Sequence, residues 1–384
     1  MFLLKLLFKN AFRHKLRSWL TILSIAIAIL ASGLLRTMVE AFYSGVERSS
    51  ANRIVTRNAI SMTFSLPYSY KEKIGQISGV REVCAVNWFG GIFIDEKHFF
   101  ANFAVEDNYL DLYPDYLFDP AEKKDYLHDR KGAVIGRKLA DRFGWKVGDT
   151  ISLRGTIYPG NWDFTIRAVY TGRDENVDER LFFFHWDYLN EAVKQTLKGR
   201  GDQVSAYIVG IERGDDAAET ASAVDAIFRN SMAETLTETE KSFNLSMISM
   251  ADSIIMIIRL VSLVVIVIIA AVAANTMSMT TRERIGEFAV LKTLGFGGGR
   301  IGALIFGESF VISLAGGLFG MVLTFPAAEM FRQLLGNFFP KFTVTTATLG
   351  SDVIACCVIG VVAAVVPTWR SIHIRIADGL RRIG

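Results

Sequence analysis

The residues whose types and spacing could do chemistry gather in one short polar segment between two long apolar runs. Glu287 to Leu294 has the pattern of a two-turn helix that Gly295 would cap, and Phe288, Leu291 and Leu294 would share a face. The charged residues of this segment are Arg282, Arg284, Glu287 and Lys292. A short amphipathic helix of this kind suits docking into a groove of a partner protein, or lying flat on lipid. The expected role of this segment is therefore binding.

One carboxylate in this part of the chain is unusual. If the next apolar run starts near Ile301, Glu308 lies about two turns inside it, where a buried carboxylate usually faces a partner or a helix end. If that run begins later, Glu308 is interfacial. Both interpretations stay open from the sequence.

Motifs for catalysis and for cofactors are missing from the sequence. It contains no G-x-x-x-x-G-K-[ST], no G-x-S-x-G and no H-E-x-x-H. Gly297-x-Gly299-x-x-Gly302 matches the dinucleotide fingerprint only literally, because no strand precedes it. The five histidines are scattered, and 42 basic against 39 acidic residues give no basic surface for nucleic acid. We expect no catalytic residue, cofactor or metal in this chain, which is predicted not to be an enzyme.

Four apolar runs, one near the start and three in the last third, must position the polar segment. Each is long enough to cross about 30 Å of hydrocarbon at about 1.5 Å per residue. The predicted spans are residues 18–38, 254–281, 301–325 and 353–369. The first run is longer than the apolar region of a usual signal peptide, so we expect an uncleaved anchor. Small residues in two pairs, Gly316 with Gly320 and Gly360 with Ala364, would let these helices pack closely.

Basic residues beside the spans predict the orientation. They place residues 1–17, 282–300 and 370–384 in the cytoplasm, because positive charge is enriched on that side. Residues 39–253 and the loop 326–352 are then outside. The chain is therefore expected to be a multi-pass membrane protein with both termini in the cytoplasm.

The external block, residues 39–253, has mixed strand and helix patterns, so an α+β domain is predicted. Its flanks, about residues 50–105 and 200–235, would form one subdomain, and the segment between them a second, inserted one. Helices over Thr37 to Ser50 and Glu234 to Ile258 would form a stalk. The alternative is two flexible linkers, but no Gly or Pro occurs between residues 231 and 275.

An ordered set of motifs resembles the MacB/FtsX-like permeases of ABC transporter systems. Arg284-Ile285-Gly286-Glu287 followed by Leu291-Lys292-x-Leu294-Gly295 is similar to that family's cytoplasmic loop, although the acid usually precedes Ile and Gly. Further similarities are Glu308 with Gly316-Gly317-x-x-Gly320, residues 133–140 with 147–151 of the external block, and Pro367, Arg370 and residues 377–381 at the end. The resemblance covers nearly the whole chain.

The resemblance implies a permease subunit in a bacterial inner (plasma) membrane. It implies a dimer with a second copy or homologue, each permease paired with a separate ABC ATPase subunit, and Glu287 to Leu294 as the coupling helix. It also implies mechanotransmission to the external domain, for export or for lipid or lipoprotein extraction. Membrane lipid is a further expected partner, and in MacB-like members residues near 105–200 would contact a periplasmic adaptor.

Two other functions stay open. One is an FtsX-like transmitter that signals to cell-wall hydrolases without transport. The other is a membrane-anchored binding or adaptor domain without an ATPase. Co-purifying proteins would discriminate among the three.

Overall fold

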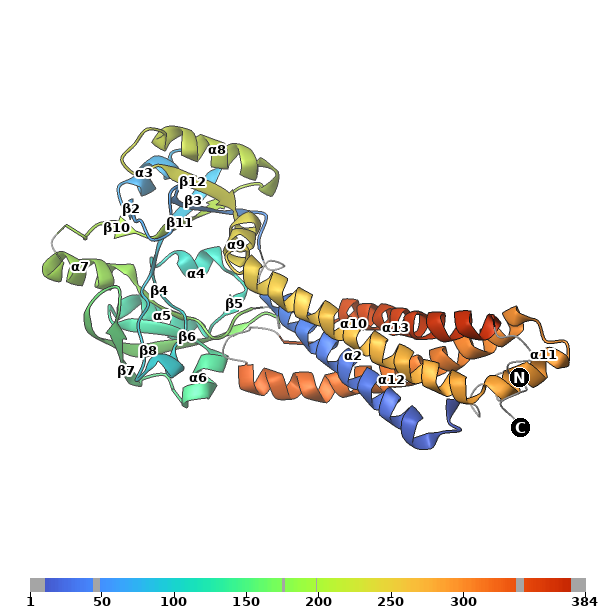
Figure 1. Cartoon of the computed structure of the whole chain (residues 1–384). Coiled ribbons are helices and arrows are strands. Elements are labelled where there is room, and N and C mark those ends of the chain that lie inside the picture. Colours follow the sequence, from blue (N-terminus) through green and yellow to red (C-terminus); the bar gives the residue numbers. More distant parts are fainter. Residues whose placement is uncertain (1–10, 44–48, 175–176, 198, 336–341, 374–384) are drawn as a thin grey trace. The chain divides into compact units, whose positions relative to one another are not determined.

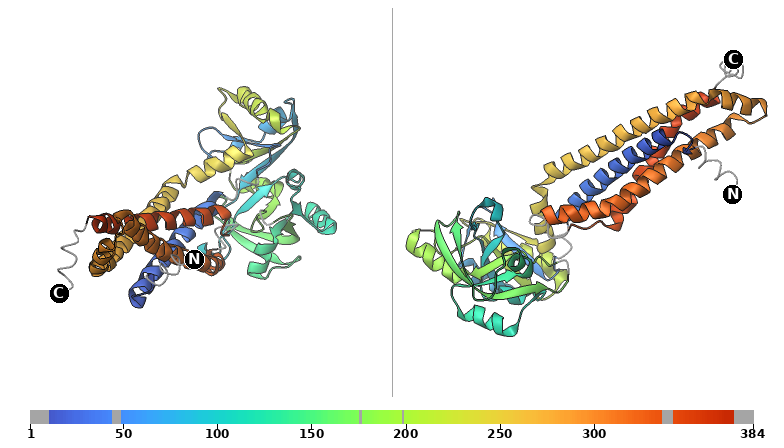
Figure 2. Two further views of the ribbon diagram at one scale, coloured as in Figure 1. Left: turned by 90° about the vertical axis from the view of Figure 1, so that its right-hand side faces the viewer. Right: turned by 90° about the horizontal axis from the view of Figure 1, so that it is seen from below.

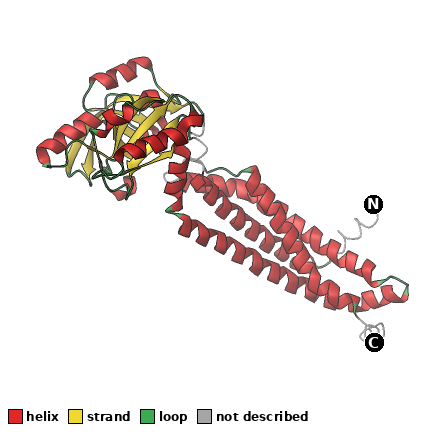
Figure 3. Ribbon diagram, turned by 90° about the horizontal axis from the view of Figure 1, so that it is seen from above, coloured by secondary structure: helices red, strands yellow, loops and turns green. Residues whose placement is uncertain are grey.

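The computed structural model describes residues 11–43, 49–174, 177–197, 199–335 and 342–373. The chain divides into two compact units. A helical unit comprises residues 1–41, 251–336 and 342–384, and a sheet unit comprises residues 42–250 and 337–341. All strands found among these described residues lie in the sheet unit (Figure 3). The expected tail motif at residues 377–381 lies outside the described residues.

Within the described residues, the helical unit contains four long helices that are apolar enough to cross a membrane. They are α2 (Lys15–Tyr43), α10 (Asp252–Glu283), α12 (Gly298–Leu335) and α13 (Thr346–Ile372). These helices confirm the predicted one-plus-three arrangement, and each extends beyond its predicted apolar run. They lie side by side in the right-hand view of Figure 2 and in Figure 3. A short helix, α11 (Ile285–Thr293), stands between α10 and α12 in the chain (Figure 1).

The long helices approach one another closely where small residues meet. A Cβ atom added to Gly316 would lie 2.8 Å from the Ile25 side chain of α2, and one added to Gly320 would lie 2.7 Å from the Ala26 carbonyl oxygen. Between α12 and α13, Ser309 donates a hydrogen bond to the carbonyl oxygen of Gly360 at 2.9 Å, and Ala364 is fully buried. The small pairs therefore lie at helix contacts, as small-residue packing in membranes requires.

The sheet unit is built on ten strands in the order β12-β1-β11-β3-β4-β9-β6-β8-β5, with β7 paired to β8. The strands are β1 (Arg53–Asn58), β3 (Val80–Trp88), β4 (Asn102–Val105), β5 (Tyr116–Leu117), β6 (Gly132–Gly136), β7 (Thr150–Gly155), β8 (Gly160–Gly172), β9 (Phe182–His185), β11 (Ala206–Ile211) and β12 (Thr235–Thr239). A separate pair joins β2 (Leu66–Pro67) to β10 (Gln203–Val204). The pairs β4–β9 and β6–β8 are parallel.

Helices pack on both faces of the sheet. They are α3 (Tyr70–Gly75), α4 (Tyr109–Leu112), α5 (Pro120–His128), α6 (Arg137–Phe143), α7 (Trp186–Thr196), α8 (Ala217–Phe228) and α9 (Glu240–Ser249). Strand β9 shows how the sheet is buried on two faces. Phe182 and Phe184 pack in one apolar cluster and Phe183 in another, because successive side chains of a strand point to opposite faces.

The two predicted subdomains are halves of one sheet. Strands from the flanks of the block (β1, β3, β11 and β12) are neighbours, and strands from the inserted segment (β6 to β9) form the other half. The parallel ladder between Asn102 and Phe182 on β4 and β9 joins them. One continuous sheet therefore spans both segments.

The predicted stalk helix over Glu234 to Ile258 is wrong in its first part. Residues 235–239 form β12, which pairs with β1, because the alternating threonines of Thr-Leu-Thr-Glu-Thr favour a strand. The following helix α9 begins at Glu240, whose buried carboxylate pairs with Arg53 of β1 at 2.8 Å. Helix α9 therefore belongs to the sheet unit, and a break at residues 250–251 separates it from α10.

Candidate coupling site

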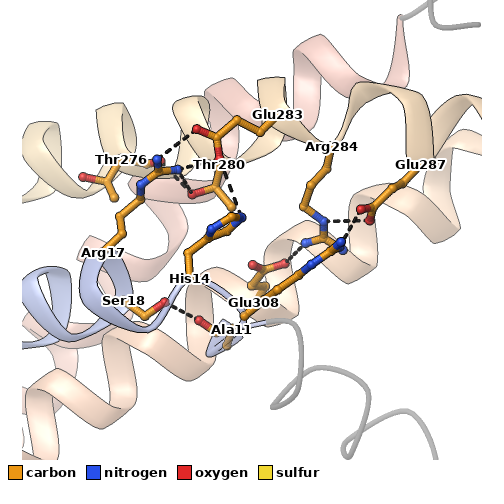
Figure 4. A network of polar contacts seen from close by, with 11 residues as sticks. Ala11, His14, Arg17, Ser18, Thr276, Thr280, Glu283, Arg284, Glu287 and Glu308 are labelled. Carbon is orange, nitrogen blue, oxygen red and sulfur yellow. Dashed lines mark hydrogen bonds and ion pairs between the residues drawn. The ribbon is translucent and has the colours of Figure 1, made fainter. Parts of the chain in front are cut away.

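Charged side chains from four elements meet at one end of the helical unit (Figure 4). We call them the coupling cluster: Arg13, Arg17, Glu283, Arg284, Glu287 and Glu308. Arg13 and Arg17 come from the beginning of the described chain, Glu283 and Arg284 from the end of α10, Glu287 from α11 and Glu308 from α12. The cluster thus ties the short helix α11 to three of the four long helices.

Arg284 and Glu308 form the buried centre of the cluster. The Arg284 guanidinium donates a hydrogen bond to a Glu308 carboxylate oxygen at 2.6 Å, and each side chain is about one-tenth exposed. The same guanidinium bonds Glu287 at 3.2 Å and lies over the Phe288 ring. The Glu308 carboxylate is therefore buried, and it has the charged partner that burial demands.

The outer part of the cluster fastens the N-terminal segment. Both terminal nitrogens of Arg17 bond the Glu283 carboxylate at 2.9 Å, the two-pronged geometry that arginine favours with carboxylates. His14 lies 3.7 Å from the same carboxylate. Figure 4 shows Arg17 and His14 turned toward Glu283 and Thr280. The end of α10 is therefore held to the start of α2.

Glu287 links this segment to α11, because it accepts hydrogen bonds from both Arg13 and Arg284. Partial burial opposes ionisation of Glu287, but those two bonds outweigh it and hold the pKa of the carboxyl below its ordinary value of 4.5. Glu287 is therefore ionised near neutral pH.

The sequence between α10 and α12 folds into α11 for identifiable reasons. Gly295 has a left-handed backbone (φ +87°), and its N–H bonds the Lys292 carbonyl while the Phe296 N–H bonds the Leu291 carbonyl. These two bonds form a Schellman cap, which ends the helix. The side chain of Phe288 is buried against Ile301 and Ile305 of α12. Helix α11 is thus fixed to α12 by both a ring contact and the ion pair.

The predicted coupling residues separate into two groups. Arg284 and Phe288 are buried and Leu291 packs beside them, so these side chains hold α11 in place. Arg282, Lys292, Leu294 and Gly295 lie at or near the surface, and the Leu294 side chain is 70% exposed. The expectation that Phe288 and Leu294 share one face is wrong, because Phe288 turns toward α12 and Leu294 lies just past the helix end. Val290, which is 42% exposed, accompanies Leu294 instead.

Sequence reasoning missed Arg13, Arg17 and Glu283 as members of the site. The basic residues before the first span served only as an orientation signal. Arg13 and Arg17 are four residues apart, a spacing that puts two side chains on one side of a helix. This spacing indicated that both could reach acidic groups at the end of a neighbouring helix.

The charged side chains of the site join helices to one another. Among the described residues, no group of three or more His, Cys, Asp or Glu side chains could hold a metal ion. The charged groups instead pair with one another across helices, and the end of α11 that carries Leu294 is exposed.

Known proteins resemble both parts of the chain. Residues 18–227 match the family described as the MacB-like periplasmic core domain, and residues 259–376 match the FtsX-like permease C-terminal family. An uncharacterized ABC transporter permease of Methanocaldococcus jannaschii is 25% identical over 352 residues, which cover 85% of this chain and 84% of that protein.

Two solved structures show a distant likeness. The periplasmic region of MacB from Actinobacillus actinomycetemcomitans is 10% identical, with a TM-score of 0.38, and covers 53% of this chain and 95% of that one. The extracellular domain of the noncanonic ABC-type transporter YknZ from Gram-positive bacteria is 13% identical, with a TM-score of 0.36, and covers 49% of this chain and 100% of that one.

Proposed function

The chain belongs to the MacB/FtsX-like family of ABC transporter permeases, and from this premise we propose that it transmits the movement of a separate ATPase subunit to its external domain. ATP would be bound and hydrolysed in that subunit. The permease would act mechanically, for export or for extraction of lipids or lipoproteins on the outer side of a plasma membrane.

The observation that carries this proposal is the way α11 is anchored. The buried Arg284–Glu308 pair and the Phe288 ring join it to α12, while Glu287 and Glu283 hold Arg13 and Arg17. The chain leaves the helical unit after α2 and re-enters it before α10. The two helices that lead into the external domain, α2 and α10, therefore each have one end in the coupling cluster.

The partner that drives α11 would dock on its exposed end. Val290 and Leu294 present apolar surface there, and helix-in-groove docking uses apolar anchors of this kind. In this proposal both termini and α11 lie in the cytoplasm. Two permeases would be needed for two ATPases, so a dimer with a second copy or a homologue completes the assembly. A periplasmic adaptor would be an additional partner of the sheet unit.

Replacing Leu294 tests the docking surface. Leu294→Asp puts a charge where an apolar anchor would enter the ATPase, and we expect association to weaken about tenfold or more. Thr293→Asp adds the same charge one residue earlier and is the matched control. Co-purification of the ATPase from native membranes, with the melting temperature of each variant, gives the readout. Equal ATPase recovery with both variants would refute the docking surface.

The match of residues 259–376 to the FtsX-like family also favours a second candidate, a non-transporting signal transmitter. The same purification separates the two functions. A co-purifying adaptor supports export, and a co-purifying cell-wall hydrolase supports signalling. Recovery of the permease without any ATPase, across several detergents, would favour an anchored binding domain.

A further inference from the structure

A cavity of about 580 Å³ opens between α2 and α10, beside the coupling cluster. Its size is in the range of pockets that hold small ligands. Basic side chains line one end of it: His14, Lys15 and Arg17. Hydroxyl groups of Thr21, Ser24 and Thr276 line it further along, together with leucine and valine side chains.

The order of these groups along α2 is informative. From Lys15 to Ser24 the helix rises about 14 Å, and over this length the lining changes from cationic to hydroxylic and apolar. The apolar Leu16 and Leu20 beside it are more than half exposed, so a ligand there would lie against hydrocarbon as well. A phospholipid has the same sequence of groups: an anionic phosphate, a polar glycerol ester region and acyl chains.

The charges at the polar end are only partly matched. Arg17 is paired with Glu283, but Lys15 forms no ion pair with any residue that the structure describes. An arginine side chain has five N–H donors, and Arg17 donates hydrogen bonds to Glu283 and Thr280. An anionic group in the cavity would therefore give Lys15 a counter-ion and occupy the remaining donors of Arg17.

We propose that this cavity binds the phosphate headgroup of an anionic phospholipid such as phosphatidylglycerol. Basic pockets between spanning helices are known places for such headgroups. A free phosphate compound shares the headgroup chemistry, but the hydroxyl and apolar walls beyond Arg17 match a lipid. The proposed orientation decides only which leaflet supplies the lipid, so the site stands independently of the ATPase docking surface.

Native mass spectrometry of the full chain, titrated with phosphatidylglycerol, phosphatidylcholine or inorganic phosphate, tests the site. We expect preferential binding of phosphatidylglycerol and about fivefold weaker binding after Lys15→Ala, the loss expected for one basic residue at an anionic membrane surface. Arg300→Ala removes an exposed basic residue outside the cavity and should change binding little. Ser24→Phe keeps the charges but narrows the hydroxyl and apolar part of the cavity, so it should reduce the preference for phosphatidylglycerol.

Several outcomes would overturn the proposal. Equal binding of the two lipids, or equal losses in Lys15→Ala and Arg300→Ala, would mean that no specific headgroup site exists. Displacement of the lipid by inorganic phosphate at equal concentration would assign the cavity to a free phosphate compound. Unchanged binding in Ser24→Phe, in a variant that keeps the wild-type melting temperature, would place the lipid elsewhere.

Discussion

Arg284 is the residue on which the arrangement of α11 depends most. Its guanidinium joins Glu308 in the interior and Glu287 nearer the surface. A buried ion pair adds little net stability over apolar residues of the same size, but loss of one partner leaves the other charge buried and alone. The pair therefore fixes where α11 sits rather than how stable the whole chain is.

Breaking this pair has a predictable cost. Glu308→Gln, or Arg284→Met, should lower the free energy of unfolding by about 3–5 kcal/mol, whereas Arg284→Met combined with Glu308→Leu should recover much of it. Denaturant unfolding in detergent measures these differences. Arg282→Met, at an exposed neighbouring position, is the control. Additive losses in the double variant would show that the two side chains do not act as a pair.

Glu287 should make the stability that the coupling cluster contributes depend on pH. Its folded-state pKa lies below 4.5, so its contribution to stability is present above pH 4.5 and is lost as the pH falls through the folded-state value. The melting-temperature difference between wild type and Glu287→Gln should be larger at pH 7 than at an acidic pH below 4.5.

The matched control for this measurement is Glu219→Gln, which changes an exposed carboxylate of α8. It should shift the melting temperature little at either pH. A wild-type to Glu287→Gln difference that grows on acidification would contradict the assigned role of the Arg13 and Arg284 hydrogen bonds.

At the scale of elements, the close contact of α2 with α12 depends on two glycines. A Cβ at Gly320 would lie 2.7 Å from a backbone oxygen of α2, which cannot move aside as a flexible side chain would. Gly320→Ala should therefore destabilise the helical unit by about 1–3 kcal/mol. Gly299→Ala, also in α12, meets no atom within 4 Å and should be neutral or slightly stabilising. Thermal unfolding in detergent compares the two, and equal effects would contradict this packing.

The long helices could be predicted from the sequence because about twenty consecutive apolar residues admit few other structures. The segment 235–239 could not be placed as readily. It lacks Gly and Pro, so helix propensity alone extends the neighbouring helix through it, whereas its pairing with β1 is a contact between residues about 180 apart in sequence. Tertiary pairing of this kind overrides local propensity.

Only part of the candidate site could be predicted, because some of its contacts join residues that are far apart in the sequence. The motif from Arg284 to Gly295 and the cap at Gly295 depend on neighbours in the chain. The partners Arg13 and Arg17 lie more than 260 residues from Glu287 and Glu283. The direction of Phe288 also depends on Ile301 and Ile305, because α11 has apolar residues on more than one side. The periodicity of the sequence does not show which of these apolar residues packs against a long helix.

For the whole molecule, charge asymmetry predicts the topology. Basic residues flank the spans at the end that carries α11, and positive-inside asymmetry sets orientation in short segments. The predicted topology puts the family's periplasmic core domain on the other side of the membrane. An exposed residue of the sheet unit and one beside α11 should therefore be on opposite sides of the membrane.

Cysteine labelling tests this arrangement directly. In a background where Cys84, Cys356 and Cys357 are replaced by alanine, Glu219→Cys in α8 should react with a membrane-impermeant maleimide in intact spheroplasts. Arg300→Cys at the start of α12 should react only after permeabilisation, because a charged reagent does not cross the hydrocarbon layer. Both positions are exposed in the structure, so reaction of both after permeabilisation controls for access within the protein. Labelling of Arg300→Cys alone in intact spheroplasts would invert the topology, and an ATPase in the cytoplasm could then not reach Leu294.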